Sequence, residues 1–163
     1  MKRLFLIAVV LSIAACATKK SYIGGTRVPY TSNNKSVLDA VEQYRLAVER
    51  GDAPALITMA HPQYWEDSGT PSGSDDYGYE GLKTVLASRL GAATEIRYTM
   101  RYMGVSHECK ELAARCKATV DVLIDASFTI QNAMGKASRP DKRDQNQLLL
   151  EWDGSRWLFL AGM

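Results

Sequence analysis

Apolar side chains recur every three or four positions in three stretches of the N-terminal half, which is the spacing of one face of a helix. The clearest stretch is residues 37–48, with Ser36 as the expected N-cap and Gly51 as the expected stop. A second, short helix is expected within residues 52–62 and a third within residues 80–91. The pattern therefore predicts three helices before any long strand.

From residue 94 onward the spacing changes to two, which is typical of strands with one buried face. Alternating apolar residues predict strands over residues 96–102, 118–130, 148–152 and 156–161. Asp153-Gly154, between the last two, is a typical hairpin turn. Helices followed by an antiparallel meander predict one α+β domain with the helices on one face of the sheet.

Four segments, taken in their order and spacing, resemble the nuclear transport factor 2-like superfamily, also called SnoaL-like. They are Glu49–Leu56, Tyr64–Asp67, Tyr79–Leu82 and Glu151–Trp157. The resemblance runs over residues 36–162 and implies three N-terminal helices packed on a curved antiparallel sheet of four long strands. In that superfamily the helices close the sheet into a cone, a cystatin-like α+β roll.

The first 15 residues have a composition unlike that of the remaining chain. They contain 12 apolar residues, two basic residues and no acidic residue, and the basic pair Lys2 and Arg3 precedes the apolar run. That run is too short to cross a bilayer, which takes about 20 apolar residues, and it is typical of a signal peptide. It ends in Ile13-Ala14-Ala15-Cys16, which resembles the lipobox of bacterial lipoproteins.

The lipobox resemblance implies that residues 1–15 are cleaved as a signal peptide. It also implies that Cys16 is acylated and that membrane lipid is the partner of the anchor. We therefore expect a lipid-anchored protein of the bacterial cell envelope. Ala17 follows the cysteine in place of Asp, which favours the outer membrane by resemblance to enterobacterial sorting.

Residues 16–35 are polar and interrupted by glycine and proline, so we expect the lipidated cysteine and a flexible tether there. The domain itself is expected at residues 36–163. Alternatively, part of the tether around Val28 to Tyr30 docks on the domain.

The whole chain carries 20 basic and 18 acidic side chains, a net charge of +2. The two basic residues among the first 15 account for this excess, so the remaining chain is formally neutral. We therefore expect no nucleic-acid binding. The chain also lacks the G-x-S-x-G, H-E-x-x-H, phosphate-loop and dinucleotide motifs, so no cofactor is expected.

Cys109 and Cys116 remain as an even pair once Cys16 is acylated. An extracytoplasmic location favours a disulfide between them. A metal site that adds His107 is the alternative, but it lacks a fourth ligand and the usual paired spacing of ligands. We therefore expect a disulfide and no metal.

The stretch from Tyr64 to Glu80 is the richest in carboxylates and aromatic rings, and in the superfamily this region lies near the open mouth of the cone. The candidate pocket residues are Tyr44, Tyr64, Glu66, Asp67, Tyr77 and Tyr79. A carboxylate beside aromatic rings suits general base catalysis, because desolvation raises its pKa. The alternatives are a solvated acidic loop, which is the commoner arrangement, and a calcium site, whose ligand spacing is absent.

Ketosteroid isomerases share the fold that the resemblance implies, and they use a tyrosine of the first helix with pocket aspartates. Tyr44 and Asp67 lie at comparable places in this chain. The later aspartate would be Asp121 or Asp125, and both fall on the polar side of their strand. This departure weakens an isomerase or hydratase interpretation.

Lys136, Arg139, Lys142 and Arg143 cluster between the second and third long strands. A solvated loop is the commoner reading, and contact with anionic headgroups is the alternative. His61 lies at a helix end, where a cation complements the helix dipole.

We expect a non-catalytic envelope lipoprotein that binds a small ligand or an envelope protein, with no catalytic residue assigned. The alternative is an isomerase, dehydratase or hydrolase of the SnoaL-like type, with Asp67 or Glu66 as general base and a tyrosine as donor. An interior filled by Trp152, Trp157 and Phe159 would exclude such an enzyme. A third interpretation is an interaction module that forms a homodimer through the outer face of the sheet.

Overall fold

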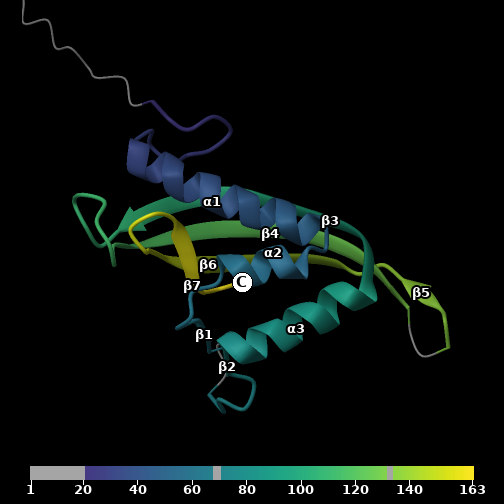
Figure 1. The fold of residues 1–163 in the computed structure, drawn as a ribbon. Coiled ribbons are helices and arrows are strands. Elements are labelled where there is room, and N and C mark those ends of the chain that lie inside the picture. The colour runs from purple at the N-terminus through teal and green to yellow at the C-terminus, as the bar shows by residue number, and fades with distance from the viewer. Residues whose placement is uncertain (1–20, 68–70, 132–133) are drawn as a thin grey trace, which may run out of the picture.

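The computed structural model describes residues 21–67, 71–131 and 134–163, so the expected signal peptide and Cys16 lie outside the described residues. Helices packed on a curved antiparallel sheet confirm the α+β fold class (Figure 1). The helices are α1 (Ser32–Glu49), α2 (Ala53–Met59) and α3 (Tyr79–Ala92). Within the described ranges, no helix combines the length and the apolar character that a membrane span requires.

The main sheet has the strand order β3-β4-β6-β7, and all neighbouring strands are antiparallel. Its strands are β3 (Ala93–His107), β4 (Lys117–Gln131), β6 (Asp141–Trp152) and β7 (Trp157–Ala161), with a short β5 (Ala137–Ser138) paired to β4. The short strands β1 (Trp65–Glu66) and β2 (Tyr77–Gly78) form a separate pair. Two register shifts in β3, after Thr94 and after Tyr102, are bulges that bend the strand.

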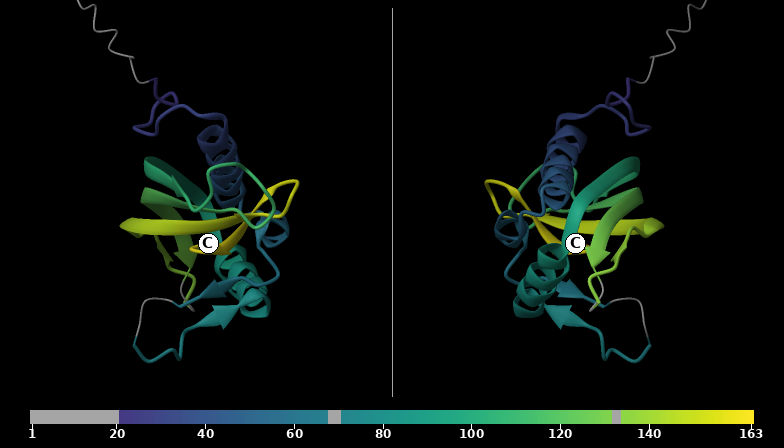
Figure 2. Two further views of the ribbon diagram at one scale, coloured as in Figure 1. Left: turned by 90° about the vertical axis from the view of Figure 1, so that its left-hand side faces the viewer. Right: turned by 90° about the vertical axis from the view of Figure 1, so that its right-hand side faces the viewer.

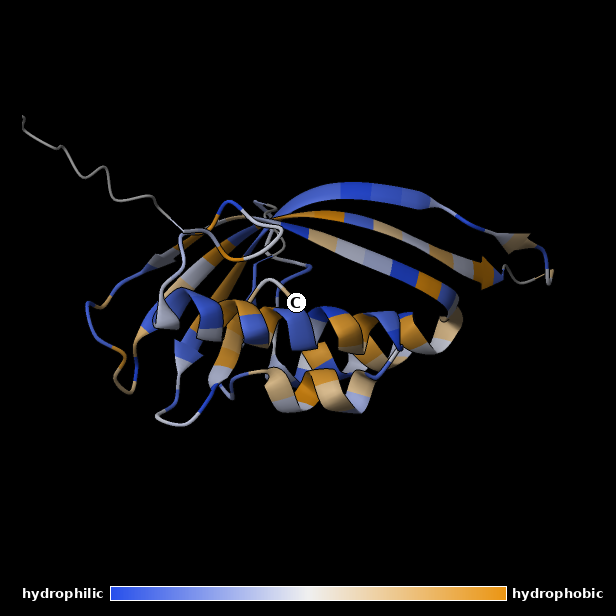
Figure 3. Cartoon of the chain, turned by 90° about the horizontal axis from the view of Figure 1, so that it is seen from above, coloured by the Kyte–Doolittle hydropathy of each residue, from blue (hydrophilic) through white to orange (hydrophobic). Residues whose placement is uncertain are grey.

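The three helices lie on one side of the sheet, and the core lies between the two layers (Figure 2). Along β4, Val120 and Val122 point toward the helices and are fully buried. They belong to the same core as Val41 of α1, Leu56 of α2 and Leu82 of α3. Figure 3 shows apolar and polar residues interleaved along helices and strands, as expected for elements with one buried side.

Asp121 and Asp125 lie on the opposite face of β4, away from the helices. Asp121 accepts a hydrogen bond from Gln147 Nε2 at 2.9 Å, and Asp125 forms an ion pair with Arg143 at 2.7 Å. Neither carboxylate faces the interior of the domain, so neither has the position of an isomerase pocket aspartate.

Helix α1 begins at Ser32, so the expected N-cap at Ser36 is wrong. Thr31 is the N-cap, because its side-chain oxygen accepts a hydrogen bond from the backbone N–H of Asn34 at 3.0 Å. Ser36 instead accepts a hydrogen bond from Trp157 Nε1 at 3.1 Å. The first turn contains polar residues only, which hides its helical period in the sequence.

Residues 21–30, which we call the N-terminal hairpin, fold back on themselves and pack against the domain. Tyr22 and Pro29 form an antiparallel bridge, and the backbone N–H of Tyr30 donates to the carbonyl of Ser21 at 2.8 Å. Val28 is fully buried in the core. Docking of this part of the expected tether is therefore confirmed.

Candidate functional site

A groove of about 610 Å³ opens where the C-terminal ends of α1 and α3 meet β3 and β4. Its wall is mostly apolar and contains Val48, Leu90, Ala92, Ala93, Ile96, Ala126, Phe128 and Ile130. The lining is completed by Ser88, Arg89, Tyr98 and Lys142. Small-molecule sites in proteins typically occupy roughly 300–1,000 Å³, so this apolar groove has the size of a ligand site.

Small residues leave this space open at the junction of α3 and β3. The run Gly91-Ala92-Ala93 ends the helix and begins the strand without a connecting loop. A side chain at Gly91 would meet open space, and Ala126 on β4 is the short residue of the facing wall. Because these side chains are short, the helix end and the sheet leave a hollow that larger residues would fill.

Among the described residues that line the groove, Arg89 of α3 and Lys142 of β6 are the charged ones. Both are exposed, and neither forms an ion pair with another described residue. Burial raises the pKa of Tyr98, so its hydroxyl stays neutral. No Asp, Glu or His from the described part of the chain lines the groove.

Tyr64 and Glu66 hold the C-terminal end of the chain. The Tyr64 hydroxyl donates to Glu66 Oε2 at 2.8 Å, and the same oxygen accepts from the backbone N–H of Gly162 at 2.8 Å. The backbone N–H of Met163 donates to Tyr64 Oη at 3.0 Å, and Asn146 Nδ2 donates to the carbonyl of Gly162 at 2.9 Å. We call these five residues the C-terminal clasp. Burial and the hydrogen bond to Glu66 raise the pKa of Tyr64.

Aromatic side chains fill the interior between α1 and β7. Tyr44 packs against Phe159 with ring centroids 5.0 Å apart, and Trp157 packs against Trp152 at 5.5 Å. Tyr44, Trp157 and Phe159 are each at most 5% exposed. Burial raises the pKa of Tyr44 well above its ordinary value. This filled interior is the arrangement expected to exclude a catalytic cavity around Tyr44.

The remaining candidate residues lie at the edge of the domain near β1 and β2. Tyr77 stacks on Tyr64 with centroids 6.4 Å apart, and burial raises its pKa. Tyr79 begins α3, with Lys83 Nζ 4.6 Å from its ring centroid. Asp67 is exposed just after β1. The structure thus brings Tyr64, Glu66 and Tyr77 together, and none of the six candidates lines the apolar groove.

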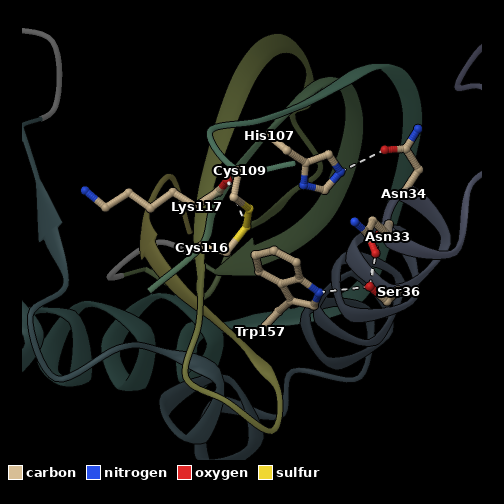
Figure 4. The surroundings of a disulfide bond; sticks show 8 residues. All are labelled: Asn33, Asn34, Ser36, His107, Cys109, Cys116, Lys117 and Trp157. Atoms are coloured by element: carbon tan, nitrogen blue, oxygen red, sulfur yellow. Dashed lines mark hydrogen bonds between the residues drawn. A yellow bond between two sulfur atoms is a disulfide. The ribbon is translucent and has the colours of Figure 1, made fainter. Parts of the chain in front are cut away.

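Cys109 and Cys116 form the expected disulfide, with Cα atoms 5.7 Å apart, in the connection between β3 and β4 (Figure 4). Cysteines bonded to each other supply no thiolate to a metal. Across the described ranges, no group of three or more His, Cys, Asp or Glu side chains is arranged to hold a metal ion. His107 Nε2 instead lies 2.8 Å from Asn34 Oδ1, which ties β3 to α1.

The expected basic loop does not form a patch of four free cations. Arg139 pairs with Glu95 at 3.1 Å and Arg143 with Asp125 at 2.7 Å. Lys142 faces the apolar groove. Lys142 and Arg143 lie in β6, so the segment is partly strand rather than the expected loop, and Arg139 and Arg143 are paired with acidic residues.

The sequence patterns did not single out the apolar groove. Wall residues such as Leu90 and Phe128 have the spacing of ordinary core residues. Arg89 lies in the last turn of α3, where a cation is common because it complements the helix dipole. The available signal was the run Gly91-Ala92-Ala93, which places three small residues where a helix meets a strand.

No protein-family model matches the chain, and no curated protein matches it. Several solved structures are similar to it. A ketosteroid isomerase-like protein from Erwinia carotovora atroseptica is 18% identical, with a TM-score of 0.58 over 82% of this chain and 95% of its own. A candidate scytalone dehydratase from Novosphingobium aromaticivorans is 12% identical, with a TM-score of 0.59 over 80% of each chain. A candidate dehydratase of the nuclear transport factor 2-like family from Streptomyces avermitilis is 12% identical, with a TM-score of 0.56 over 79% of this chain and 92% of its own.

These similarities show that the chain has the nuclear transport factor 2-like fold, as its sequence predicted. Identities of 12–18% show the fold alone. An inference about function therefore has to rest on the residues of this chain.

Proposed function

We propose that this chain is a lipoprotein of the bacterial cell envelope whose domain binds a small amphiphile without chemical conversion. The anchor is acylated Cys16, with the outer membrane as the favoured location. The ligand has an apolar body and an anionic group, and it lies in the apolar groove between Arg89 and Lys142.

The observation that carries this proposal is the composition of the groove. Eight of its twelve lining residues are apolar, so a hydrocarbon or aromatic body is removed from water there. Each buried methylene contributes about 0.8 kcal/mol. The charged lining residues, Arg89 and Lys142, are both cationic, which favours a carboxylate, sulfonate or phosphate on the ligand.

The described lining of the groove also lacks the commonest general bases. A general base has to lie within hydrogen-bond reach of the reacting proton, and no described lining residue is a carboxylate or a histidine. Glu66, one base of the enzyme alternative, already accepts hydrogen bonds from Tyr64 and from the backbone of Gly162. A dehydratase or isomerase centred on Glu66 would draw on a carboxylate whose Oε2 belongs to the C-terminal clasp.

Two fluorescent probes with the same kind of aromatic body test the ligand class. Anilinonaphthalene sulfonate carries an anion and phenylnaphthylamine does not. We expect residues 17–163, which retain all described contacts, to bind both probes saturably. In the Arg89→Gln/Lys142→Gln variant, affinity for the sulfonate falls about tenfold, because a hydrogen bond to a charged group contributes roughly 1.5–3 kcal/mol. Affinity for the neutral probe is retained.

Two further variants control this experiment. Ala126→Phe fills the groove and should reduce the binding of both probes. Lys83→Gln removes a cation of α3 that pairs with Glu80 outside the groove, and it should change neither affinity. Equal losses for Lys83→Gln and Arg89→Gln/Lys142→Gln, or binding unaffected by Ala126→Phe, would contradict the proposed site.

A further inference from the structure

The end of the molecule formed by the N-terminal hairpin exposes a set of aromatic and apolar side chains. Tyr22 and Tyr30 of the hairpin are 53% and 55% exposed, and Met103 near the end of β3 is 48% exposed. Figure 2 shows this hairpin projecting beside the first turn of α1. Rings and thioethers gain by leaving water, so their exposure at one end of the domain points to a partner surface.

Two arginines line a hollow beside the N-terminal hairpin. A hollow of about 260 Å³ is lined by Gly25, Thr26, Arg27, Arg101, Tyr102 and Met103. Arg27 and Arg101 are exposed, come from segments far apart in the sequence, and form no ion pair with another described residue. Guanidinium groups present several parallel N–H donors and bind phosphate oxygens in pairs. The hollow is therefore suited to a phosphate headgroup.

The charge of the adjoining sequence has the same sign. Residues 16–38 contain four basic side chains, Lys19, Lys20, Arg27 and Lys35, and no Asp or Glu. Lys35 pairs with Asp39 at 2.6 Å, which leaves the excess on the hairpin side. This local excess is hidden in the balanced charge of the remaining chain. Near an anionic bilayer each such cation contributes about 1 kcal/mol.

The proposed anchor keeps this end close to the membrane. Cys16 and Ser21 are separated by five Cα–Cα steps of about 3.8 Å, so they lie at most about 19 Å apart in any conformation. An acylated Cys16 lies at the bilayer surface, and this reach keeps the first hairpin residue within the headgroup region or just outside it. This step rests on the proposed lipid anchor, whereas the exposed rings and the arginine pair do not.

We propose that the N-terminal hairpin and the adjoining residues 101–103 of β3 form a contact surface for an anionic phospholipid bilayer. Arg27 and Arg101 bind a headgroup phosphate in the hollow between them. Tyr22 and Tyr30 enter the interfacial layer, where an amphipathic ring has one apolar side and one polar group to satisfy. The surface orients the domain on the membrane, in addition to the tethering that an acyl chain provides.

A nitroxide at residue 22 tests this contact in the full chain. The Tyr22→Cys variant is labelled and reconstituted in phosphatidylcholine vesicles with or without phosphatidylglycerol, and collisions with oxygen and with a water-soluble nickel complex are measured. We expect the ratio of oxygen to nickel collisions to rise several-fold when phosphatidylglycerol is present. A label at Ser138→Cys, in exposed β5 at the other end of the sheet (Figure 1), should not change.

Charge variants decide whether the two arginines cause the effect. Arg27→Gln/Arg101→Gln should abolish the response at residue 22, whereas Arg139→Gln/Arg143→Gln, which removes two paired arginines elsewhere, should leave it intact. Melting temperatures of both variants check that the domain is folded. The proposal is overturned if residue 22 stays equally accessible to the nickel complex in both vesicle types, or if the two double variants behave alike.

Flotation of the same vesicles separates this proposal from the lipid anchor. An acylated chain floats with neutral and anionic vesicles and with every charge variant. A chain held by the contact surface alone floats only with anionic vesicles and loses flotation in Arg27→Gln/Arg101→Gln. Flotation with anionic vesicles alone therefore shows that the chain has no lipid anchor but retains the contact surface.

Discussion

Among the described residues, the side chain of His107 has one hydrogen-bond partner, Asn34, which determines where the neutral ring carries its proton. Asn34 donates through Nδ2 to the carbonyl of Pro29 at 2.8 Å, so its Oδ1 is the acceptor that faces His107 Nε2. The proton of the neutral imidazole therefore lies on Nε2. Nδ1 is buried and has no hydrogen-bond partner among the described residues. Protonating Nδ1 would place a charge there without an acceptor, and burial accordingly lowers the pKa of His107.

This arrangement predicts a loss of stability in acid. The folded pKa of His107 lies below its unfolded value of about 6.5, so the unfolded chain binds the proton first as the pH falls. The free energy of unfolding should therefore decrease as the pH drops below about 6.5. Urea denaturation at pH 7.5 and pH 5 measures the change. His107→Gln keeps a donor for Asn34 but does not titrate, so its stability should depend less on pH. Equal pH dependence in the two proteins would refute this role.

The C-terminal clasp joins three elements that are distant in the sequence. Tyr64 and Glu66 come from the segment of β1, Asn146 comes from β6, and Gly162 and Met163 follow β7. Gly162 has a φ of 89°, and a Cβ there would collide with the carbonyl oxygen of Gln147, so only glycine fits. The carboxylate and the hydroxyl that suggested catalysis instead fix the last turn of the chain.

Removing the carboxylate charge of Glu66 should therefore lower the stability of the fold. It should have a smaller effect on ligand binding in the apolar groove. We expect Glu66→Gln to lower the free energy of unfolding by about 1–3 kcal/mol, because a buried acceptor loses part of its hydrogen bonding. Glu111→Gln, which changes an exposed glutamate in the same way, is the matched control and should change stability by less than about 0.5 kcal/mol. Urea denaturation compares both with the parent chain. A stable Glu66→Gln variant would show that the clasp contributes little.

Elements with one continuous apolar side were predictable, and polar element ends were not. The alternation of β4 placed Val120 and Asp121 on opposite faces correctly. In contrast, β6 begins at Asp141, seven residues before the first expected apolar residue, Leu148. Its first half pairs with β4 through the backbone while its side chains stay mostly exposed, so no period marks it. The start of α1 at Ser32 was missed for the same reason.

The candidate site was harder to predict than the fold, because the groove depends on short side chains, which leave no pattern in the sequence. The rings and carboxylates of the Tyr64–Glu80 stretch are conspicuous in the sequence, yet Tyr64 and Glu66 are used in the C-terminal clasp. The apolar groove depends on short side chains at Ala92 and Ala126, which alone resemble any helix end or strand. Only the packing of α3 against the sheet shows that nothing fills the space beside them.

At the scale of the whole molecule, the two proposed surfaces come within three residues of each other along β3, at Tyr98 and Arg101, but lie beside different parts of α1. The N-terminal hairpin precedes its first residue, Ser32, and the apolar groove includes Val48 near its last turn. The helix has 18 residues, which corresponds to about 27 Å. The proposed membrane contact and the proposed ligand site share no lining residue, so variants in one are expected to leave the other unchanged.

Cleavage of the precursor tests the proposed location of the whole molecule as a lipoprotein of the cell envelope. Globomycin inhibits the peptidase that cleaves lipoprotein precursors, so we expect treated cells to accumulate the full-length precursor. Cys16→Ser should block processing in untreated cells as well, because it removes the acylated thiol. Electrophoresis of radiolabelled chain measures both. Normal maturation in the presence of globomycin would contradict the lipoprotein proposal. It would not affect the interpretation of probe binding in the apolar groove.

The length of α1 also has a kinetic consequence. If α1 stands upright on the headgroups, Val48 lies about 27 Å from the first turn of the helix, and an amphiphile then reaches the groove through water and not by lateral diffusion. Loading has to proceed through water, by desorbed monomers or by transfer from a soluble carrier. The rate of loading should then follow the aqueous solubility of the amphiphile, with each added methylene slowing its escape from the membrane.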